Sequence, residues 1–272
     1  MKKMIFICLL ALFAPHEGIA AGERTPAGGR ALAMGGTSVT MRDFWSICNN
    51  QAGAAWIKQT SAGLSFENRF LLGELMYEQL GFALPMKPGT FSLMANRFGN
   101  SHYSEMKAGL SYARKLGKHF SVGVQLDYLH IHVAEDYGNK TLASCEIGLL
   151  YNGDKHLSIG VQLLNPVPVK IILHPPEQLP SLICIGLAYQ FSDEFLVSVE
   201  TEKDLQNPLA FRTGAEYRFA APACARIGIS TCPVTFTFGV GLEFGKLKFD
   251  MASGYHQALG FSPSGSLTYS FN

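Results

Sequence analysis

The chain has 272 residues, of which 47% are hydrophobic and only 16% charged, and its 22 basic and 21 acidic residues leave a net charge of +1. Soluble proteins carry about 25% charged residues, so this content is low for a soluble domain. The near-neutral charge disfavours nucleic-acid binding, and the 19 Phe and 10 Tyr exclude a disordered chain. Beyond residue 14 no run of about 18 apolar residues occurs, so α-helical membrane spans are not expected. A soluble β-rich domain or a membrane barrel remains.

The first 21 residues have the pattern of a secretory signal peptide. Lys2 and Lys3 give a positive start, residues 4–14 are apolar, and small residues follow at 18, 20 and 21. Such an apolar stretch is too short to cross a bilayer, whereas it suits an export signal. We therefore expect residues 1–21 to be a signal peptide, with an ordinary buried N-terminal helix as the alternative.

Residues 22–60 do not alternate between apolar and polar positions. They contain the glycine-rich stretch 28–37 (GGRALAMGGT) and the stretch 49–53 (NNQAG). Because no Gly-Lys-Ser/Thr motif follows the glycines, a nucleotide site is not expected. The small residues and Trp56 suggest short helical turns packed in a small space, so we expect a plug in the lumen of a barrel; an extension outside the barrel is the alternative. The plug motif consists of Arg30, Gly35, Gly36, Asn50, Ala52 and Gly53.

From residue 61 to residue 272 apolar and polar residues alternate with a period of two. Positions 120, 122, 124, 126 and 128 are large and apolar, with Ser, Gly, Gln and Asp between them. Strict alternation indicates strands that separate an apolar medium from a polar one. Turn signals such as Lys87-Pro88-Gly89 divide the region into about fourteen strands, near the ~9–11 residues that a tilted membrane strand needs. The expected strands are 62–70, 74–85, 89–99, 104–116, 120–134, 141–153, 156–164, 181–191, 195–204, 208–218, 223–231, 233–244, 246–256 and 261–271.

An even number of strands agrees with the lengths of the links between them. Bacterial barrels begin and end in the periplasm, where turns are short, and carry longer loops outside. With fourteen strands, the tight turns all fall on one side and the longer links 134–140 and 165–180 fall on the other. The expected fold is therefore all-β, a transmembrane antiparallel β-barrel of about 14 strands whose apolar face meets lipid. A soluble β-sandwich, which would bury that face, is the alternative.

The polar face of the strands carries charges that we expect to point into the lumen. Counting from the turn centres places Glu243 opposite Lys248 and Glu216 opposite Arg226. Opposite charges on facing positions contribute roughly 0.2–1 kcal/mol each. We expect a structural network that fills a narrow lumen, with a polar conduit or substrate contact as the functional alternative. The predicted network consists of Asp127, Glu146, Glu200, Arg212, Glu216, Arg226, Glu243, Lys248 and Asp250, with Glu200 facing Arg212.

The mature chain keeps five cysteines, an odd number that cannot pair completely within one chain. Cys224 and Cys232 flank a short segment and are candidates for a disulfide. Cys145 and Cys184 lie in strand-like patterns and are expected to be small apolar fillers. Together with Cys48 they show no CxxC spacing, so neither a zinc motif nor a redox motif is expected.

Two short patterns invite a site of another kind. His130 and His132 lie two positions apart on one strand face, but the sequence shows no third ligand for a metal. His102 and Ser104 would form a base and nucleophile pair, but the strand pattern offers no Asp or Asn to orient the histidine. We therefore expect no catalytic residue, no metal and no cofactor, and keep an outer-membrane hydrolase as a minor alternative.

The N-terminal motifs resemble those of the FadL/PorV superfamily, in which a Gly-Arg-Ala-x-x-x-Gly-Gly segment precedes an Asn-Pro-Ala-Gly motif. This chain has GGRALAMGGTSV followed by NNQAG. Further matches are Leu179-Pro180 leading into IGLAYQF, GAEYRF at 214–219, ARIGI at 225–229 and the C-terminal stretch that begins FTFGVGLEF, in an order similar to the PorV/PorQ branch of Bacteroidetes-type outer membranes. The resemblance implies a fourteen-stranded barrel with a lumenal N-terminal segment. Gln51 stands where the family usually has Pro, and the stretch 42–45 (RDFW) replaces an expected acidic pair.

The resemblance implies two non-catalytic functions. The PorV/PorQ likeness implies a component of protein secretion or surface attachment (type IX-like) that docks secretion-machinery proteins or exported cargo. Its expected outer-loop contacts are Asn165, Pro166, His174 and Pro180. The FadL likeness implies a passive transporter of small hydrophobic molecules, which requires an apolar pocket beside the plug and an interrupted wall. The charged inward positions favour the first slightly. Either protein would be surrounded by outer-membrane lipid and would bind no nucleic acid.

Overall fold

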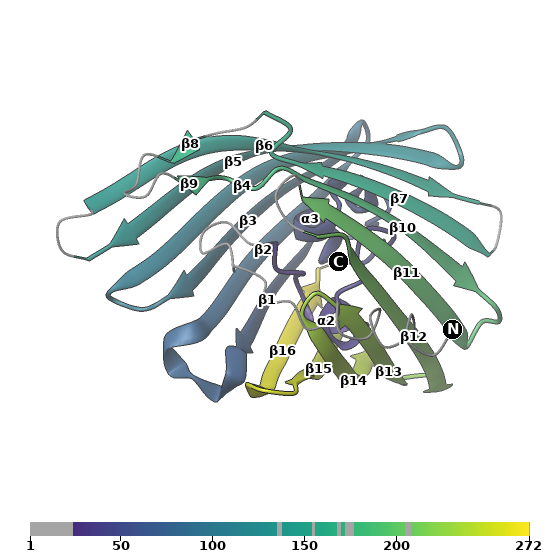
Figure 1. Ribbon diagram of the computed structural model, residues 1–272. Helices are drawn as coiled ribbons and strands as arrows, with labels where there is room; N and C mark the ends of the chain where they lie inside the picture. Colours follow the sequence, from purple (N-terminus) through teal and green to yellow (C-terminus); the bar gives the residue numbers. More distant parts are fainter. Residues whose placement is uncertain are drawn as a thin grey trace, which may run out of the picture.

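Fourteen antiparallel strands form a closed barrel around the N-terminal segment (Figure 1). The computed structural model describes residues 24–134, 138–153, 156–167, 170–171, 177–204 and 208–271. The expected signal peptide and His174 lie outside the described residues. The strands are β1 (Ser61–Asn68), β2 (Met76–Met86), β3 (Gly89–Gly99), β4 (Tyr103–Leu116), β5 (Phe120–Val133), β6 (Gly138–Asn152), β7 (Leu157–Leu164), β10 (Leu182–Gln190), β11 (Phe195–Asp204), β12 (Ala210–Ala220), β13 (Ala223–Thr231), β14 (Val234–Phe244), β15 (Leu247–His256) and β16 (Gly260–Ser270).

The predicted barrel is confirmed, and every predicted strand has an observed counterpart whose ends differ from it by three residues or fewer. The largest difference is at β6, which begins at Gly138 because its pairing with β5 continues to Val133. A short pair that the sequence did not predict, β8 (Lys170–Ile171) with β9 (Glu177–Gln178), lies in the link between β7 and β10. β1 pairs with both β16 and β2, which closes the barrel and excludes the β-sandwich alternative.

The two faces of each strand have opposite polarity. On β5, the side chains of Leu126 and Tyr128 face outward and are 68% and 54% exposed, whereas Ser121 and Gln125 face inward and are buried. The same alternation continues on β13 and β14, where Ile227 and other large apolar side chains are exposed. An apolar exterior around a polar interior is the reverse of a soluble domain and suits a lipid surrounding.

The two ends of the barrel differ in the length of their links. We call one the turn end, where β1 starts and β16 stops, joined by a hydrogen bond from the Phe271 amide to the Thr60 carbonyl (2.7 Å). The tight links 86–89, 116–120 and 244–247 lie there. The opposite end, which we call the loop end, carries the longest link, between Leu164 and Leu182. The longest link and these tight turns therefore lie at opposite ends as expected, but the loop end also has short links at 231–234 and 256–260.

The N-terminal segment from residue 24 to residue 60 lies inside the barrel, and we call it the plug (Figure 1). It contains three short helices, α2 (Gly29–Ala33), α3 (Ser46–Asn49) and α4 (Gln51–Ala54). Helices this short are not stable alone in water, so their shape depends on the surrounding wall. Among the described residues, no helix is long and apolar enough to cross a membrane.

Wall glycines allow the plug to pack against the strand backbone. Gly228 on β13 lies against the backbone of Gly35, and Gly160 on β7 lies against the carbonyl group of Val39. A Cβ atom at either wall position would overlap with the plug. Because glycine has no side chain, the lumen at Gly228 and Gly160 is wide enough for the plug to fill it.

Candidate functional site

A cavity of about 330 Å³ lies at the loop end, beside the plug. This volume is at the lower end of the range of about 300–1,000 Å³ that is usual for small-molecule sites. Its apolar lining comes from the loop-end halves of the wall strands and from the link before β10. The apolar lining includes Met94, Phe98, Leu129, Ile131, Leu179 and Leu182; the polar lining includes Arg24, Arg69, Tyr77, Glu105, Lys107 and Glu146.

The apolar side of the cavity arises where the inward face of the wall changes from polar to apolar. On β5, Gln125 and Asp127 point inward near the middle of the strand, and Leu129 and Ile131 continue on the same face toward the loop end. Leu129 is 8% exposed and Ile131 is 1% exposed. Met94 on β3 is also buried and faces this space. The alternation is unchanged, but the residues on its inner face become apolar.

A buried polar network forms the floor of the cavity. The Lys107 ammonium group on β4 contacts the Glu146 carboxylate and lies 3.3 Å from Oδ2 of Asp127. The other carboxylate oxygen of Glu146 accepts hydrogen bonds from Gln51 Nε2 (2.7 Å) and Gln162 Nε2 (2.9 Å). Buried charges require such partners, since an unpaired one is costly to desolvate. The charges of Lys107, Asp127 and Glu146 are therefore paired with one another, which leaves the apolar lining as the free surface for an uncharged ligand.

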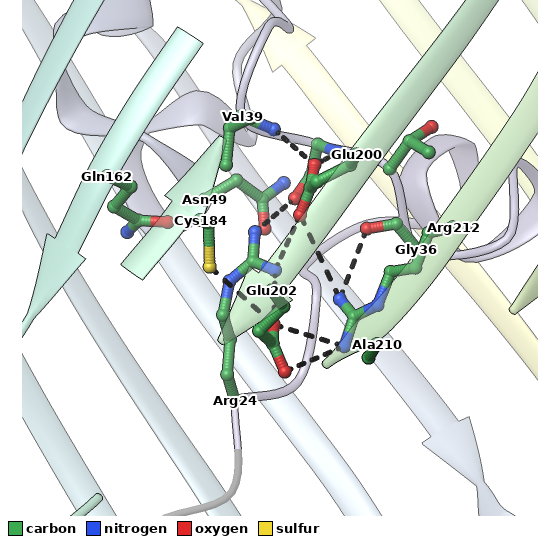
Figure 2. Close-up of polar contacts among 12 residues, drawn as sticks. Arg24, Gly36, Val39, Asn49, Gln162, Cys184, Glu200, Glu202, Ala210 and Arg212 are labelled. Carbon is green, nitrogen blue, oxygen red and sulfur yellow. Dashed lines mark hydrogen bonds and ion pairs between the residues drawn. The ribbon is translucent and has the colours of Figure 1, made fainter. Parts of the chain in front are cut away.

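A second cluster holds the first described residue of the plug to β11 (Figure 2). Nη1 of Arg24 lies 2.8 Å from Glu200 Oε1 and 2.9 Å from Glu202 Oε2. Arg212 on β12 pairs with Glu202 at 3.1 Å and lies 4.0 Å from Glu200. Cys184 on β10 directs its thiol toward Glu202 Oε2 at 3.6 Å. The plug is thereby anchored by charge close to the cavity.

A third network lies nearer the turn end and joins the plug to β12, β13 and β15. Arg30 donates to both oxygens of Glu216 at 2.8 Å, and Arg226 donates to Glu216 Oε2 at 2.6 Å. Arg30 also pairs with Asp43 of the plug, and Arg226 pairs with Asp250. A smaller cavity of about 110 Å³ borders this network. Bidentate pairing of arginine and carboxylate gives this anchor a defined geometry.

The mouth of the loop-end cavity is bordered by the link between β1 and β2. This link contains the 3₁₀ turns η2 (Arg69–Leu71) and η3 (Gly73–Leu75). Arg69 lies over the rings of Tyr77 and Phe98 at 5.9 and 5.5 Å, and its Nη2 donates to Thr25 Oγ1 of the plug at 2.7 Å. The link therefore contacts the cavity and the plug together.

Within the described part of the chain, the hydrogen-bonded wall has a gap at the loop end, on one side of β6. β6 pairs with β7 from Asn152 to Glu146, and the Asn165 amide reaches the Cys145 carbonyl at 2.9 Å. Toward the loop end, residues 138–144 of β6 pair with β5 alone among the described residues. Ser144 and Asn165 line the cavity at this place, so the cavity extends to the gap.

The predicted charge network separates into distinct groups in the structure. The three facing pairs expected from the turn centres occupy facing register positions. Glu243 and Lys248 lie at the turn-end rim, where their side chains are about half exposed and 3.1 Å apart. The other predicted members are inside the barrel and contact plug residues, Lys107 or one another; they are Asp127, Glu146, Glu200, Arg212, Glu216, Arg226 and Asp250.

The plug motif residues have local structural reasons for their identities. Gly35 and Gly36 have φ of +71° and +83°, in the left-handed region that favours glycine. Asn50 is the N-cap of α4, accepting from the Ala52 amide and donating to the Val39 carbonyl. Gly53 packs against the Met41 carbonyl and the Ser46 side chain, where a Cβ atom would overlap with both. Arg30 belongs to the turn-end network described above.

Of the expected outer-loop contacts, the three that the structure describes, Asn165, Pro166 and Pro180, do not form one exposed patch. Asn165 is 4% exposed, and its Nδ2 donates to the Leu179 carbonyl at 3.1 Å, which holds together the two ends of the link. It lines the cavity, as does Pro180, so neither is displayed for a docking partner. Pro166 is exposed. Asn165 is buried because its Nδ2 donates to the backbone carbonyls of the link, and its role in partner contact stays a prediction.

The cysteine pair, the two histidines and the histidine–serine pair that the sequence offered do not form a disulfide, a metal site or a catalytic pair in the structure. Cys224 and Cys232 are both free, which corrects the proposed disulfide, because they lie at opposite ends of β13. His130 and His132 lie on the outer face of β5, in contact with Thr141 and Asn139 of β6. His102 lies in the loop-end link before β4, with its Nδ1 3.4 Å from Ser101 Oγ, and not beside Ser104.

Sequence reasoning missed two cations that are central to the site. Lys107 lies on the inward face of β4, and the alternation of Glu105, Lys107 and Ser111 with apolar residues would have shown this. Arg24 lies in the irregular plug, where no periodicity indicates direction. The pairing of Arg24 with β11 depends on the path of the plug through the lumen and has no signal in the sequence.

Comparisons with known proteins identify related folds. No family model and no curated protein matches the sequence. Among solved structures, the CymD monoaromatic hydrocarbon channel aligns with a TM-score of 0.72 and 13% identity over 90% of this chain and 97% of that one. A Pseudomonas aeruginosa FadL homologue aligns at 0.70 and 12%, covering 93% and 100% of the two chains. The Ralstonia pickettii toluene transporter TbuX aligns at 0.67 and 14%, covering 90% and 98%. The chain has the fold of FadL-like barrels.

Proposed function

We propose that this chain is an outer-membrane channel that binds small, largely apolar molecules in the loop-end cavity and passes them across the membrane. The observation that carries the proposal is the cavity itself, which lies beside the plug and has an apolar side formed by Met94, Leu129 and Ile131. The apolar exterior supports a location in lipid, and the matched structures are named as hydrocarbon channels and toluene transporters. The charges around the cavity are paired with one another, which favours an uncharged ligand.

The transporter role is better supported than the secretion role. A secretion scaffold would present its outer loops to a partner, but Asn165 and Pro180 line the cavity instead. The matched structures reported above include a channel and a transporter by name. The FadL-like alternative therefore replaces the PorV/PorQ-like scaffold as the leading interpretation.

The proposed route runs from the loop end into the cavity and sideways through the gap beside β6. The plug fills the lumen below the cavity, and strand pairing is continuous around the barrel at that height. Near residues 144 and 165 the cavity reaches the gap in the wall. This gap is the interruption that passive transport of an apolar molecule into lipid requires.

A matched pair of substitutions on β5 tests the cavity as the binding site. Leu129→Trp places an indole in the cavity, whereas Leu126→Trp makes the same change on the outer face, where the side chain is 68% exposed. Binding of N-phenyl-1-naphthylamine, a small fluorescent apolar probe, is measured on the full chain in detergent, and probe uptake is measured in cells. We expect about tenfold weaker binding for Leu129→Trp, equivalent to about 1.4 kcal/mol, and no change for Leu126→Trp. Unchanged binding in a natively migrating Leu129→Trp variant would show that the cavity is not the site.

A further inference from the structure

Cys184, Glu200 and Glu202 form a buried cluster on the inward face of β10 and β11 (Figure 2). The cysteine sulfur and one oxygen from each carboxylate all lie within 4.8 Å of one another. Cys184 and Glu202 are facing residues in the strand register, and Glu200 follows on the same face of β11. This cluster lies apart from the apolar lining of the cavity, and the reasoning below is independent of the proposed transport.

Each carboxylate in the cluster has one oxygen that is already held and one that faces Arg24. Glu200 Oε2 accepts from the backbone amides of Ser38 (2.7 Å) and Val39 (3.0 Å), while its Oε1 contacts Arg24. Glu202 Oε1 accepts from Arg212 at 3.2 Å, while its Oε2 faces Arg24 and also lies 3.1 Å from Arg212. Supporting contacts of this kind orient metal ligands in known sites. If Arg24 moves away, two oriented oxygens remain beside the thiol.

A fourth potential metal ligand, the side-chain oxygen of Gln162, lies on the neighbouring strand and has no hydrogen-bond partner among the described residues. Gln162 on β7 faces Cys184 in the strand register and is 0% exposed. Its Nε2 donates to Glu146, but among the described residues its Oε1 accepts no hydrogen bond. In Figure 2 this amide oxygen points toward Cys184. An unpartnered buried acceptor is costly and rare, so its position beside three other donors indicates a ligand.

We propose that this cluster binds a thiolate-seeking divalent cation of the Zn²⁺ type, which exchanges with the guanidinium of Arg24. The donors are one thiolate, two carboxylate oxygens and one amide oxygen, a set that Zn²⁺ and Cd²⁺ accept and that harder cations such as Mg²⁺ do not favour. The exchange conserves charge, because the dication enters while one guanidinium cation and one thiol proton leave. The proton passes from Cys184 to solvent.

The geometry needs only small adjustments of side chains. Around a tetrahedral Zn²⁺ with bonds of about 2.0–2.3 Å, neighbouring ligand atoms lie roughly 3.5 Å apart. The Cys184 sulfur and the two carboxylate oxygens now lie within 4.8 Å of one another, so each moves inward by about an ångström or less when a smaller cation replaces the guanidinium. Metal binding also frees Arg24 from β11, which detaches the start of the plug.

Titration of the full chain in detergent with CdCl₂ tests this site, because a cadmium–thiolate bond gives an ultraviolet charge-transfer band. We expect a saturable band in the wild type, with ZnCl₂ competing for it. Arg24→Gln removes the competing cation, so we expect cadmium affinity to rise about tenfold or more, the size of one charge-assisted contact. Glu200→Gln should weaken binding while leaving the thiol in place.

The matched control is a cysteine with a similar setting elsewhere on the inner wall. Cys184→Ser should abolish the band, whereas Cys224→Ser should retain it. Cys224 lies on β13 and lines the small turn-end cavity together with Glu216 and Asp250. As a check of folding, each variant must migrate on a gel as a folded barrel when the sample has not been heated. A band that survives in Cys184→Ser, or no band in the wild type and in Arg24→Gln, overturns the proposal. If Arg24→Gln does not fold, the comparison of Cys184→Ser with Cys224→Ser decides it.

Discussion

Gln51 Nε2 donates a hydrogen bond to Glu146 Oε2 at 2.7 Å, and this contact joins the first turn of α4 to the barrel wall. Gln51 is 0% exposed, and the same nitrogen lies 3.3 Å from Gln125 Oε1. Glu146 in turn contacts Lys107 at the floor of the cavity. The residue that departs from the Asn-Pro-Ala-Gly pattern is therefore an anchor between the plug and the site.

Gln51→Pro removes this anchor while preserving the helical turn. Gln51 is the first residue of α4 and follows Asn50, whose backbone is extended (φ −151°, ψ 104°). Proline is accepted at such a position because its fixed φ suits a first helical turn. Losing a hydrogen bond to a buried carboxylate costs about 1.5–3 kcal/mol. We expect the plug to unfold at a lower urea concentration, measured by fluorescence, since Trp45 and Trp56 are the two tryptophans of the chain.

Gln51→Glu is the companion variant for this test. It nearly preserves side-chain size but places a second carboxylate against Glu146, where like charges repel in a buried setting. We expect it to lower plug stability more than Gln51→Pro does. Identical urea curves for the wild type and both variants would contradict the anchoring role.

The strand pattern was predictable because every wall residue faces either lipid or lumen. Alternation on β5 and β14, together with turn residues, is enough to locate strands and their ends. Facing pairs such as Glu216 and Arg226 follow from the turn centres once the strands are placed. The pair β8 and β9 was not predicted because two-residue strands carry no period.

The candidate site was less predictable because it depends on contacts between distant segments. The apolar inner residues Leu129 and Ile131 continue a face that is polar at Asp127, so periodicity alone assigns them to the lumen but not to a cavity. The contact of Arg24 with Glu200 joins residues separated by 176 positions and is set by the path of the plug. No local pattern in the sequence encodes it.

Glu216→Gln tests the turn-end anchor of the plug. Glu216 receives hydrogen bonds from both Arg30 and Arg226, and its side chain is 11% exposed. Removing one partner of a buried ion pair costs about 3–5 kcal/mol, because the remaining charges stay buried. We expect the plug fluorescence transition to shift to lower urea and ion conductance in planar bilayers to rise.

Glu243→Gln provides the matched control for that substitution. Glu243 also pairs with a cation across a hairpin, but the side chains of Glu243 and Lys248 are 50% and 48% exposed. An exposed pair contributes about 0–1 kcal/mol. Equal effects of Glu216→Gln and Glu243→Gln on stability would show that burial of the Glu216 network does not hold the plug.

Labelling of Cys48 should depend strongly on pH. Burial raises the pKa of the Cys48 thiol to about 12, so the reactive thiolate is scarce at neutral pH. Since the thiolate fraction grows tenfold per pH unit below the pKa, we expect iodoacetamide labelling of Cys48 to accelerate steadily between pH 7 and pH 10. Peptide mass spectrometry measures the rate, with Cys232 in the turn after β13 as the reference for an accessible thiol. A Cys48 rate that matches Cys232 at pH 7 would argue against burial of this thiol.

Backbone strain at the mouth of the cavity is testable by a glycine substitution. Leu71 has φ of +59° next to Phe70 at +58°, and its side chain is 63% exposed. A left-handed conformation costs a non-glycine residue about 1–2 kcal/mol, so Leu71→Gly should raise the free energy of unfolding by about 1 kcal/mol. Leu72→Gly is the control, because Leu72 has φ of −98° and is 51% exposed; there the added freedom of the unfolded chain should lower stability by about 0.4–1 kcal/mol. Free energies of unfolding in urea that rise for Leu71→Gly and fall for Leu72→Gly would locate the strain in the link that Arg69 joins to the plug. Changes of the same sign in both variants would show that this link is relaxed.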